Sequence, residues 1–146
     1  MIQSWDATWL EVAQVIAKRS KCSRAQVGAV IVNSSKRVIA TGYNGPAADY
    51  QVEGECANWC ERAQTGVLDT FYNTCPSIHA EANALLYVDR SAVEGGTLYI
   101  TTAPCFSCAK LISNSGIARV VWAKSNDAHR QPEQVIEYLR KCGILV

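Results

Sequence analysis

Hydrophobic positions near the start of the chain recur every three or four residues. They are Trp5, Trp9, Val12, Ala13 and Ile16. This spacing predicts an amphipathic helix over residues 5–19, with Ser4 placed to cap its start. The runs VGAVIV (27–32) and RVIATG (37–42), separated by the polar turn NSSK, then predict two strands joined as a hairpin. We expect the helix to cover one face of the sheet to which these strands belong.

The pattern is lost over residues 43–77, which contain Gly, Pro, Asn, Asp and three cysteines but no sustained period. A structureless segment of this length is uncommon inside a compact domain unless something organises it. We therefore interpret residues 43–77 as a cysteine-bearing insertion within a single domain that spans 1–146.

Helix and strand signals alternate after the insertion. Helices are predicted to begin near His79, to follow Pro104 and end at Gly116, and to run from Pro132 to about Lys141. Strands are predicted over GTLYITT (96–102) and ARVVWA (118–123), and GILV (143–146) is interpreted as a short edge strand. The order of these elements predicts an α/β fold, a three-layer α/β/α sandwich with a five-stranded mixed sheet.

Composition narrows the class of partner. The chain has 146 residues, is 49% hydrophobic, and balances 14 basic against 13 acidic residues for a net charge of +1. A near-neutral chain offers no strong field to a nucleic acid or an anionic membrane, so we expect neither as a partner and favour a small ligand. No apolar run approaches the about 20 residues that span a bilayer, and the N-terminus lacks a basic, apolar leader. We expect a cytoplasmic protein.

Seven cysteines are many for such a chain. They are Cys22, Cys56, Cys60, Cys75, Cys105, Cys108 and Cys142. In a reducing compartment, clustered thiols indicate metal binding or catalysis more than disulfides, and the odd number argues against full pairing. Cys142, in the last helix, is interpreted as a core residue.

Two short motifs are candidates for chemistry. In PCFSC, Cys105 and Cys108 lie three positions apart at a helix start, which places both sulfurs on one face where the helix dipole favours thiolates. In HAE, His79 begins another predicted helix. An imidazole and two thiolates suit zinc and leave one tetrahedral position open, as a catalytic site requires.

Glu81 lies two positions after His79 and is the candidate general acid and base. A lone C-x-x-C is often a redox pair or half of a structural zinc site, and a lone H-x-E is usually accidental. H-x-E followed by P-C-x-x-C, each at a helix start, is the signature of zinc nucleoside deaminases.

Across nearly its whole length the sequence resembles the cytidine deaminase-like zinc enzymes and, within them, the deoxycytidylate (dCMP) deaminases. The resemblance rests on SKCSRAQVGAVIV, GYNGPAAD, the cysteine-bearing insertion, IHAEANALL, EGGTLYITTAPCFSCAK and SGIARVVW, in that order. It implies hydrolysis of dCMP to dUMP and ammonia, which supplies thymidylate synthesis. It also implies a catalytic zinc on His79, Cys105 and Cys108, with Glu81 moving protons.

The resemblance further implies substrate contacts. The Ala80 N–H would bind the pyrimidine carbonyl, a backbone carbonyl near Thr102 the leaving amine, and Asn44 a sugar hydroxyl; an ordinary Asn-Gly turn is the alternative for Asn44. The monophosphate needs donors, and the loop KRSKCSR (18–24) offers Ser23, Arg24 and Lys21, unless this basic loop is merely solvated. Tyr87 is expected to contact the base or a neighbouring subunit, or to lie in the core. Some relatives carry a tyrosine where this chain has AKSNDAHR (123–130), which is a departure near the phosphate.

The remaining cysteines, Cys22, Cys56, Cys60 and Cys75, are expected to hold a second, structural zinc that pins the insertion over the active site, since similar enzymes often have one. Three of them plus another group, or buried free thiols, are the alternatives. The resemblance also implies a homohexamer activated by dCTP and inhibited by dTTP, with Mg²⁺ accompanying the nucleotide effector. The effector site would include Tyr43, Asn44 and Gly45, and Arg90 would reach a neighbour's nucleotide unless it only favours a helix dipole.

Rival interpretations stay open at this point. Another zinc deaminase would share both motifs and act on a 5-substituted dCMP, a free nucleoside, a riboflavin-pathway intermediate or adenosine in tRNA. A tRNA substrate usually requires a basic surface, which the composition lacks. A catalytically silent zinc-binding module would have no need of Glu81.

Overall fold

The computed structural model of the chain describes residues 1–66, 75–123 and 130–146. Its sheet contains four strands: β1 (Gly28–Val32), β2 (Val38–Tyr43), β3 (Thr97–Ile100) and β4 (Arg119–Trp122). They lie in the order β2-β1-β3-β4, with β1 antiparallel to both neighbours and β3 parallel to β4. The predicted mixed sheet is confirmed.

The prediction of five strands is wrong for the described part of the chain. Only Leu145 of GILV pairs with the sheet, in a single parallel bridge to Arg119. Its N–H donates to the carbonyl of Ala118 at 3.0 Å and its carbonyl accepts from Val120 N at 2.9 Å. Gly143, with φ of 79°, turns the chain out of the last helix immediately before this point, and one bridged residue does not continue as a ladder.

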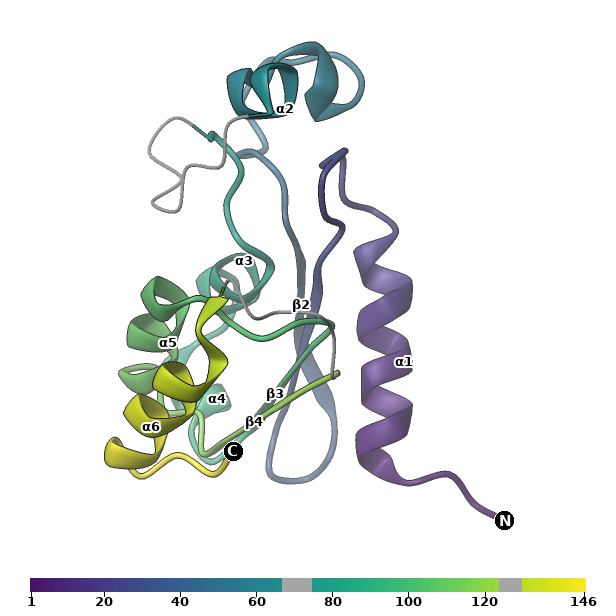
Figure 1. The fold of residues 1–146 in the computed structure, drawn as a ribbon. Coiled ribbons are helices and arrows are strands. Elements are labelled where there is room, and N and C mark those ends of the chain that lie inside the picture. Colours follow the sequence, from purple (N-terminus) through teal and green to yellow (C-terminus); the bar gives the residue numbers. More distant parts are fainter. Residues whose placement is uncertain (67–74, 124–129) are drawn as a thin grey trace.

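One face of the sheet is covered by α1 (Trp5–Ala17) (Figure 1). The Ser4 hydroxyl accepts a hydrogen bond from Ala7 N at 3.2 Å, which confirms the predicted cap. The helix ends two residues earlier than its pattern predicts. A core cluster between helix and sheet contains Ala13, Val30, Val32 and Tyr99, with Trp9, Leu10, Val12, Ile16 and Val121 packed around it.

The opposite face carries the other helices and the larger core cluster. They are α3 (Ala80–Leu86), α4 (Arg90–Val93), α5 (Phe106–Ser113) and α6 (Pro132–Lys141). Buried residues on this side come from every strand except β2 and from all four helices. Two cores on two faces give the three-layer arrangement that the element order predicts (Figure 1).

In its described residues, 43–66 and 75–77, the insertion contains two helices too short to leave a periodic signal: a 3-10 turn over Cys56–Asn58 and α2 (Glu61–Thr65). Figure 1 shows α2 well away from the sheet. A two-residue bridge closes the base of the insertion, since Gly45 N donates to Ile78 O at 3.1 Å and Ile78 N to Gly45 O at 2.8 Å. A further bond, from Cys56 N to Lys21 O at 2.8 Å, ties the insertion to the loop before β1.

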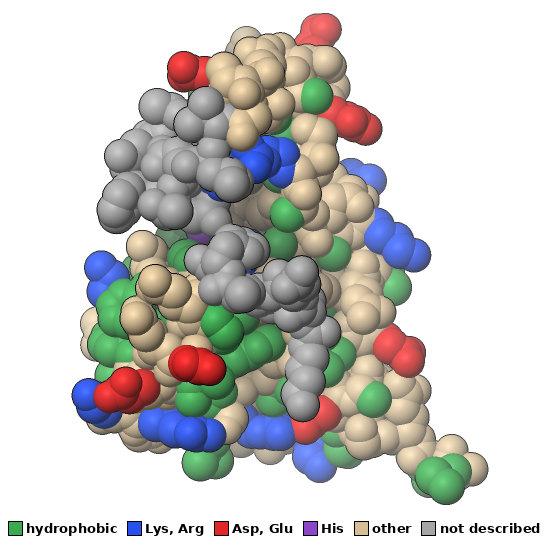
Figure 2. Space-filling view, in the orientation of Figure 1, with side chains coloured by type: hydrophobic (Ala, Val, Ile, Leu, Met, Phe, Trp, Pro, Cys, Tyr) green, Lys and Arg blue, Asp and Glu red, His purple; other side chains and the backbone are tan. Residues whose placement is uncertain are grey.

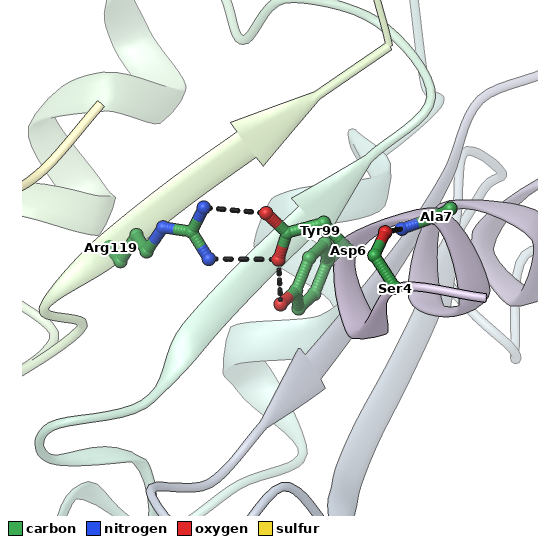
Figure 3. A network of polar contacts seen from close by, with 5 residues as sticks. All are labelled: Ser4, Asp6, Ala7, Tyr99 and Arg119. Carbon is green, nitrogen blue, oxygen red and sulfur yellow. Dashed lines mark hydrogen bonds and ion pairs between the residues drawn. The ribbon is translucent and has the colours of Figure 1, made fainter. Parts of the chain in front are cut away.

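A polar network attaches the start of α1 to the sheet (Figure 3). Arg119 donates to both carboxylate oxygens of Asp6, at 2.8 and 2.6 Å, and the Tyr99 hydroxyl donates to Asp6 Oδ1 at 2.8 Å. The bond from Arg119 holds the pKa of Asp6 below its ordinary value. Burial, aided by the bond to Asp6, raises the pKa of Tyr99 to about 12. The carboxylate of Asp6 thus joins α1 to β3 and β4.

The surface agrees with the near-neutral composition. On the face shown in Figure 2, basic and acidic side chains are interspersed among the described residues. None of the helices in the described ranges is long and apolar enough to cross a membrane.

Candidate active site

Two helix N-termini bring together the three residues that the sequence predicts as zinc ligands. His79 is the N-cap of α3, Cys105 is the N-cap of α5, and Cys108 lies in the first turn of α5. His79 Nδ1 lies 3.4 Å from the Cys105 sulfur and 3.3 Å from the Cys108 sulfur. Within residues 1–66, 75–123 and 130–146, this is the one group of three or more His, Cys, Asp or Glu side chains whose ligand atoms all lie within 4.8 Å of one another.

The three side chains of this cluster shift one another's pKa values. A hydrogen bond from the Cys108 thiol, supported by His79, lowers the pKa of Cys105 to about 4. The same bond, together with burial, raises the pKa of Cys108, and the bond to Cys105 raises the pKa of His79. Cys105 is therefore held as a thiolate, whereas the raised pKa values of His79 and Cys108 favour protonated forms that a metal would displace. One nitrogen and two sulfurs form the donor set that zinc prefers, with a fourth position left for water or substrate.

Glu81 lies in the first turn of α3 and is only 1% exposed. Burial raises the pKa of its carboxyl group. Its Oε1 atom is buried without a hydrogen-bond partner in the described part of the molecule. Because such an oxygen costs folding free energy, its retention beside the metal-ligating cluster points to a water or a substrate group that it contacts during the reaction.

The position of α3 depends on Gly42 in β2. A Cβ atom at Gly42 would overlap the carbonyl oxygen of Ala80 and the backbone nitrogen of Ala84, so only glycine lets the helix lie this close. Asn83 also fixes the helix, since its Nδ2 donates to Tyr43 O at 2.9 Å. Neither residue was predicted to support the site, because a close approach between distant segments leaves no local pattern.

The residues expected at the pyrimidine and sugar flank the cluster in sequence. Ala80 is fully buried at the start of α3, and Thr102 is half-buried in the short segment between β3 and Cys105. Asn44 is 8% exposed; its Oδ1 accepts from Val27 N and its Nδ2 donates to Ala25 O, both at 2.8 Å. Asn44 therefore holds the loop before β1, and one donor and one lone pair of its amide remain for a sugar hydroxyl.

The predicted phosphate donors contact the insertion. The Ser23 hydroxyl lies 3.1 Å from the Cys56 sulfur, and Arg24 donates to Arg62 O at 3.1 Å. Both residues line a shallow depression of about 390 Å³ formed by residues 20–26 and Glu55. These contacts join the loop to the insertion, and no contact with His79, Cys105 or Cys108 is among them.

Of the four cysteines expected at a second zinc, Cys60 and Cys22 lie near Cys75, and Cys56 contacts Ser23, the neighbour of Cys22. Cys56 accepts a bond from Ser23 N at 3.0 Å and Cys22 one from Ala25 N at 3.5 Å. Burial raises the pKa of Cys75, with further contributions from a hydrogen bond to Cys60 and from the nearby Cys22. No three of these four sulfurs, all in the described ranges, lie as close together as the ligand atoms of His79, Cys105 and Cys108, which are within 4.8 Å of one another. The second zinc therefore stays a prediction.

The remaining candidate residues lie at the surface or in turns. Tyr87 is 79% exposed at the end of α3, so the core alternative does not hold for it. Arg90 donates to the carbonyl of Asn114, the C-cap of α5, at 2.7 Å, which matches the helix-end alternative. Tyr43 is exposed and Gly45 forms the bridge to Ile78. The expectation that Cys142 is a core residue is wrong: it follows α6 as its C-cap and is exposed.

Sequence reasoning missed Arg130. Its Nη1 donates to the carbonyl of Ala103 at 3.0 Å, two residues before Cys105, and its charge acts on His79, Glu81 and Cys108. A cation directly before the N-terminus of a helix, here α6, is unfavourable for the helix dipole. That mismatch was the available signal that Arg130 has another role.

Comparisons with known proteins agree with this geometry. The sequence profile of the family described as "Cytidine and deoxycytidylate deaminase zinc-binding region" matches residues 3–124. The deoxycytidylate deaminase of Mycobacterium phage D29 is 45% identical over 124 residues, which cover 84% of this chain and 96% of that protein. The Saccharomyces cerevisiae deoxycytidylate deaminase is 39% identical over 148 residues, which cover all of this chain but 45% of the yeast protein.

A solved structure matches the fold from end to end. The apo crystal structure of the dCMP deaminase from cyanophage S-TIM5 aligns with a TM-score of 0.74 and 25% identity, covering 100% of this chain and 98% of the cyanophage chain. The profile match includes both motifs that supply His79, Glu81, Cys105 and Cys108. On these grounds the chain belongs to the cytidine and deoxycytidylate deaminase zinc-binding family.

Proposed function

We propose that this protein is a zinc-dependent hydrolase that converts dCMP and water to dUMP and ammonia, and so supplies dUMP for thymidylate synthesis. The observation that carries the proposal is the buried, unpartnered Oε1 of Glu81 beside the cluster of His79, Cys105 and Cys108. A zinc site that served structure alone would not need that carboxyl group. The similarity to phage and yeast proteins named deoxycytidylate deaminase supports dCMP as the substrate.

In this mechanism His79, Cys105 and Cys108 would hold the zinc. When bound, zinc acts as a Lewis acid that makes hydroxide available near neutral pH. Glu81 accepts the proton that the attacking water loses and delivers it to N4 of the cytosine as the C4–N4 bond breaks. Burial of Glu81 suits this role, because the raised pKa lets the carboxyl group hold a proton between the two transfers.

The other substrate contacts follow the family resemblance and the chain's own geometry. The Ala80 N–H, at the start of α3, would donate to the pyrimidine carbonyl, and a carbonyl near Thr102 would accept from the leaving amine. Asn44, held by residues 25 and 27, would use its remaining amide donor on the sugar. Ser23 and Arg24 remain candidates for the phosphate, and exposed Tyr87 for a neighbouring subunit.

Assembly and regulation rest on the resemblance. We propose a homohexamer with dCTP as activator, dTTP as inhibitor and Mg²⁺ accompanying the effector, at a site that includes Tyr43, Asn44, Gly45 and Arg90. Exposed Leu86 and Tyr87 give α3 an apolar end that supports contact between subunits. A second zinc on Cys22, Cys56, Cys60 and Cys75 is proposed to organise the insertion. A cytoplasmic setting is proposed because clustered thiols that bind metal fit a reducing compartment.

The test is ammonia release from dCMP, 5-methyl-dCMP, deoxycytidine and tRNA adenosine, measured side by side on protein whose zinc has been counted. We expect turnover of dCMP that is lost on zinc removal and restored by zinc. Turnover of one of the other three substrates in preference to dCMP would replace the proposed substrate. Absence of any turnover, with zinc bound and dCTP added, would favour the catalytically silent alternative.

A further inference from the structure

The segment that connects β3 to α5 leads into the candidate active site but has no helix or strand of its own. It runs from Thr101 to Pro104 and is followed directly by Cys105. Its start is held by β1, since Thr101 N donates to Gly28 O at 3.0 Å and Thr101 Oγ1 accepts from Gly28 N at 3.1 Å. Beyond Thr101, the position of Cys105 depends on contacts that the rest of the segment makes.

Arg130 supplies such a contact from a distant part of the chain. Its Nη1 donates to the carbonyl of Ala103 at 3.0 Å. Ala103 is fully buried, and so is Pro104, the residue that separates it from Cys105. The bond therefore joins the residue before the start of α6 to buried backbone that lies next to a metal-ligating side chain.

Three features indicate that Arg130 does not occupy this position for the benefit of its own helix. It directly precedes Gln131, the N-cap of α6, where a cation opposes the helix dipole. Gln131 has φ of 52° and ψ of 56°, left-handed values that residues other than glycine rarely adopt, and its side chain forms no capping bond. The Nε atom of Arg130 is buried without a hydrogen-bond partner in the described part of the molecule. Each feature opposes folding, so the contact that Arg130 makes requires another explanation.

The charge of Arg130 is compatible with a role at the metal-ligating cluster. It lies close enough to act on His79 and Cys108. Cysteine ligates zinc as the thiolate, so a zinc-bound cluster contains two negative sulfurs, those of Cys105 and Cys108. A cation nearby attracts both sulfurs, in addition to what its hydrogen bond does for the backbone before them.

We propose that Arg130 is a positioning residue for the metal centre: through the Ala103 carbonyl it fixes the segment that leads into Cys105, and so keeps the three ligand side chains together for zinc. Residues that orient metal ligands from outside typically contribute about 10- to 100-fold to metal affinity. The inference rests on the proposed function for the reaction that the metal serves, but zinc affinity is measured without turnover. Arg130 acts through Ala103 and transfers no proton.

The experiment measures zinc affinity by competition with a chelator in Arg130→Met, Arg130→Lys and Arg140→Met. The zinc equivalent that is missing from Cys108→Ser identifies the site under test. Arg130→Met removes both the donor and the charge and should weaken zinc binding about 10- to 100-fold. Arg130→Lys keeps a cationic donor and should recover part of the loss. Arg140 is exposed on α6, so Arg140→Met provides the matched loss of charge and should bind zinc as wild type does.

The urea midpoint of the metal-free protein is measured on the same samples. Wild-type zinc affinity in Arg130→Met, with or without a lower midpoint, would overturn the inference, because Arg130 would then serve the fold alone. Equal weakening in Arg140→Met would also overturn it. Arg130→Gln, which is shorter and uncharged, should show the same loss and carries the test if Arg130→Met does not fold. Turnover of dCMP is scored separately: Arg130-dependent zinc affinity without turnover would keep the inference and reject the proposed function.

Discussion

Glu81 is buried with one unpartnered oxygen in a place where the fold gains nothing from a carboxyl group. A residue of this kind lowers the stability of the protein and is explained by its chemistry. Glu81→Gln keeps the shape of the side chain and one potential acceptor but cannot transfer protons. We expect kcat for ammonia release to fall by at least about 10²- to 10⁴-fold while zinc content stays at its wild-type value.

The control for this variant is Glu94→Gln, which removes an exposed carboxylate next to α4 and should leave kcat unchanged. Turnover by Glu81→Gln near the wild-type rate would remove Glu81 from the mechanism. Loss of zinc in that variant would instead indicate that Glu81 supports the metal cluster, so zinc content is measured on the same sample.

At the residue scale, the sequence predicts the members of the cluster because their spacing is local. Cys105 and Cys108 share one helical turn, and His79 and Glu81 share another, so two short motifs define four side chains. Arg130 and Gly42 depend on which distant segments the fold brings together, and no spacing rule identifies them. The exposure of Cys142 was mispredicted for a related reason, since a helix pattern does not reveal where the helix ends against its neighbours.

Two glycines place one helix on each face of the sheet. Gly42 admits α3 on the cluster side, and Gly28 admits α1 on the opposite side, where a Cβ would overlap the carbonyl oxygen of Ala13. Alanine at either position would push the helix backbone away from the strand that carries the substitution. We expect each variant to lose about 1–3 kcal/mol of unfolding free energy. Gly42→Ala should also weaken zinc binding, because α3 carries His79, while Gly28→Ala should keep the wild-type zinc affinity.

Urea denaturation and zinc competition with a chromogenic chelator measure the two properties separately. Each glycine variant serves as the control for the other. Both are expected to lose similar stability, but Gly42→Ala displaces α3, which carries His79, and Gly28→Ala displaces α1, which does not. Equal zinc affinities in the two variants, at equal losses of stability, would mean that the cluster does not depend on how closely α3 lies against β2.

The ion pair at the start of α1 predicts a pH-dependent contribution to stability. Because its bond to Arg119 lowers the pKa of Asp6 in the folded state, the contribution is present above the unfolded pKa of about 3.9 and is lost as the pH falls through the lower, folded value. The pair is partly exposed, so we expect Asp6→Asn to lose only about 1 kcal/mol at pH 7. The difference from wild type should shrink as the pH approaches 3.

Urea denaturation at a series of pH values tests this, with Glu137→Gln as the control. Glu137 forms a fully exposed pair with Lys141 on α6, and its loss should leave the midpoint unchanged. A constant difference between Asp6→Asn and wild type from pH 7 to pH 3 would show that the ionisation of Asp6 does not stabilise the attachment of α1.

Element lengths explain which parts of the fold the sequence predicts. The start of α6 at Pro132 and its end at about Lys141 are confirmed, because Pro132 opens the helix and its apolar positions repeat through Leu139, although Cys142 follows the helix instead of lying in it. In contrast, α2 and α4 have five and four residues, too few for a helical period to appear. The expected fifth strand fails in the same way, since a run of four residues, three of them apolar, does not determine whether more than one of them pairs with the sheet.

For the whole molecule, the alternation of helices and strands was sufficient to predict three layers, but it gave no account of what holds the insertion. Neither core cluster contains a described residue of the insertion, which is tied to the rest of the chain by the Gly45–Ile78 bridge and the bond from Cys56 to Lys21. Cys56 and Cys60 are nonetheless buried, and Cys75 is hydrogen-bonded to Cys60. Buried thiols without a core around them fit metal binding better than packing.

Metal content therefore provides the test of the insertion. We expect two zinc equivalents per wild-type chain, one equivalent in Cys75→Ser, and wild-type content in Cys142→Ser, where the thiol is exposed and distant from the other cysteines in sequence. Because a metal there would fold the insertion, Cys75→Ser should also be cleaved faster within residues 43–77 under limited proteolysis, with the cluster of His79, Cys105 and Cys108 still loaded. One zinc per wild-type chain, unchanged by Cys75→Ser and lost in Cys108→Ser, would mean that the four thiols bind no zinc and that hydrogen bonds alone hold the insertion.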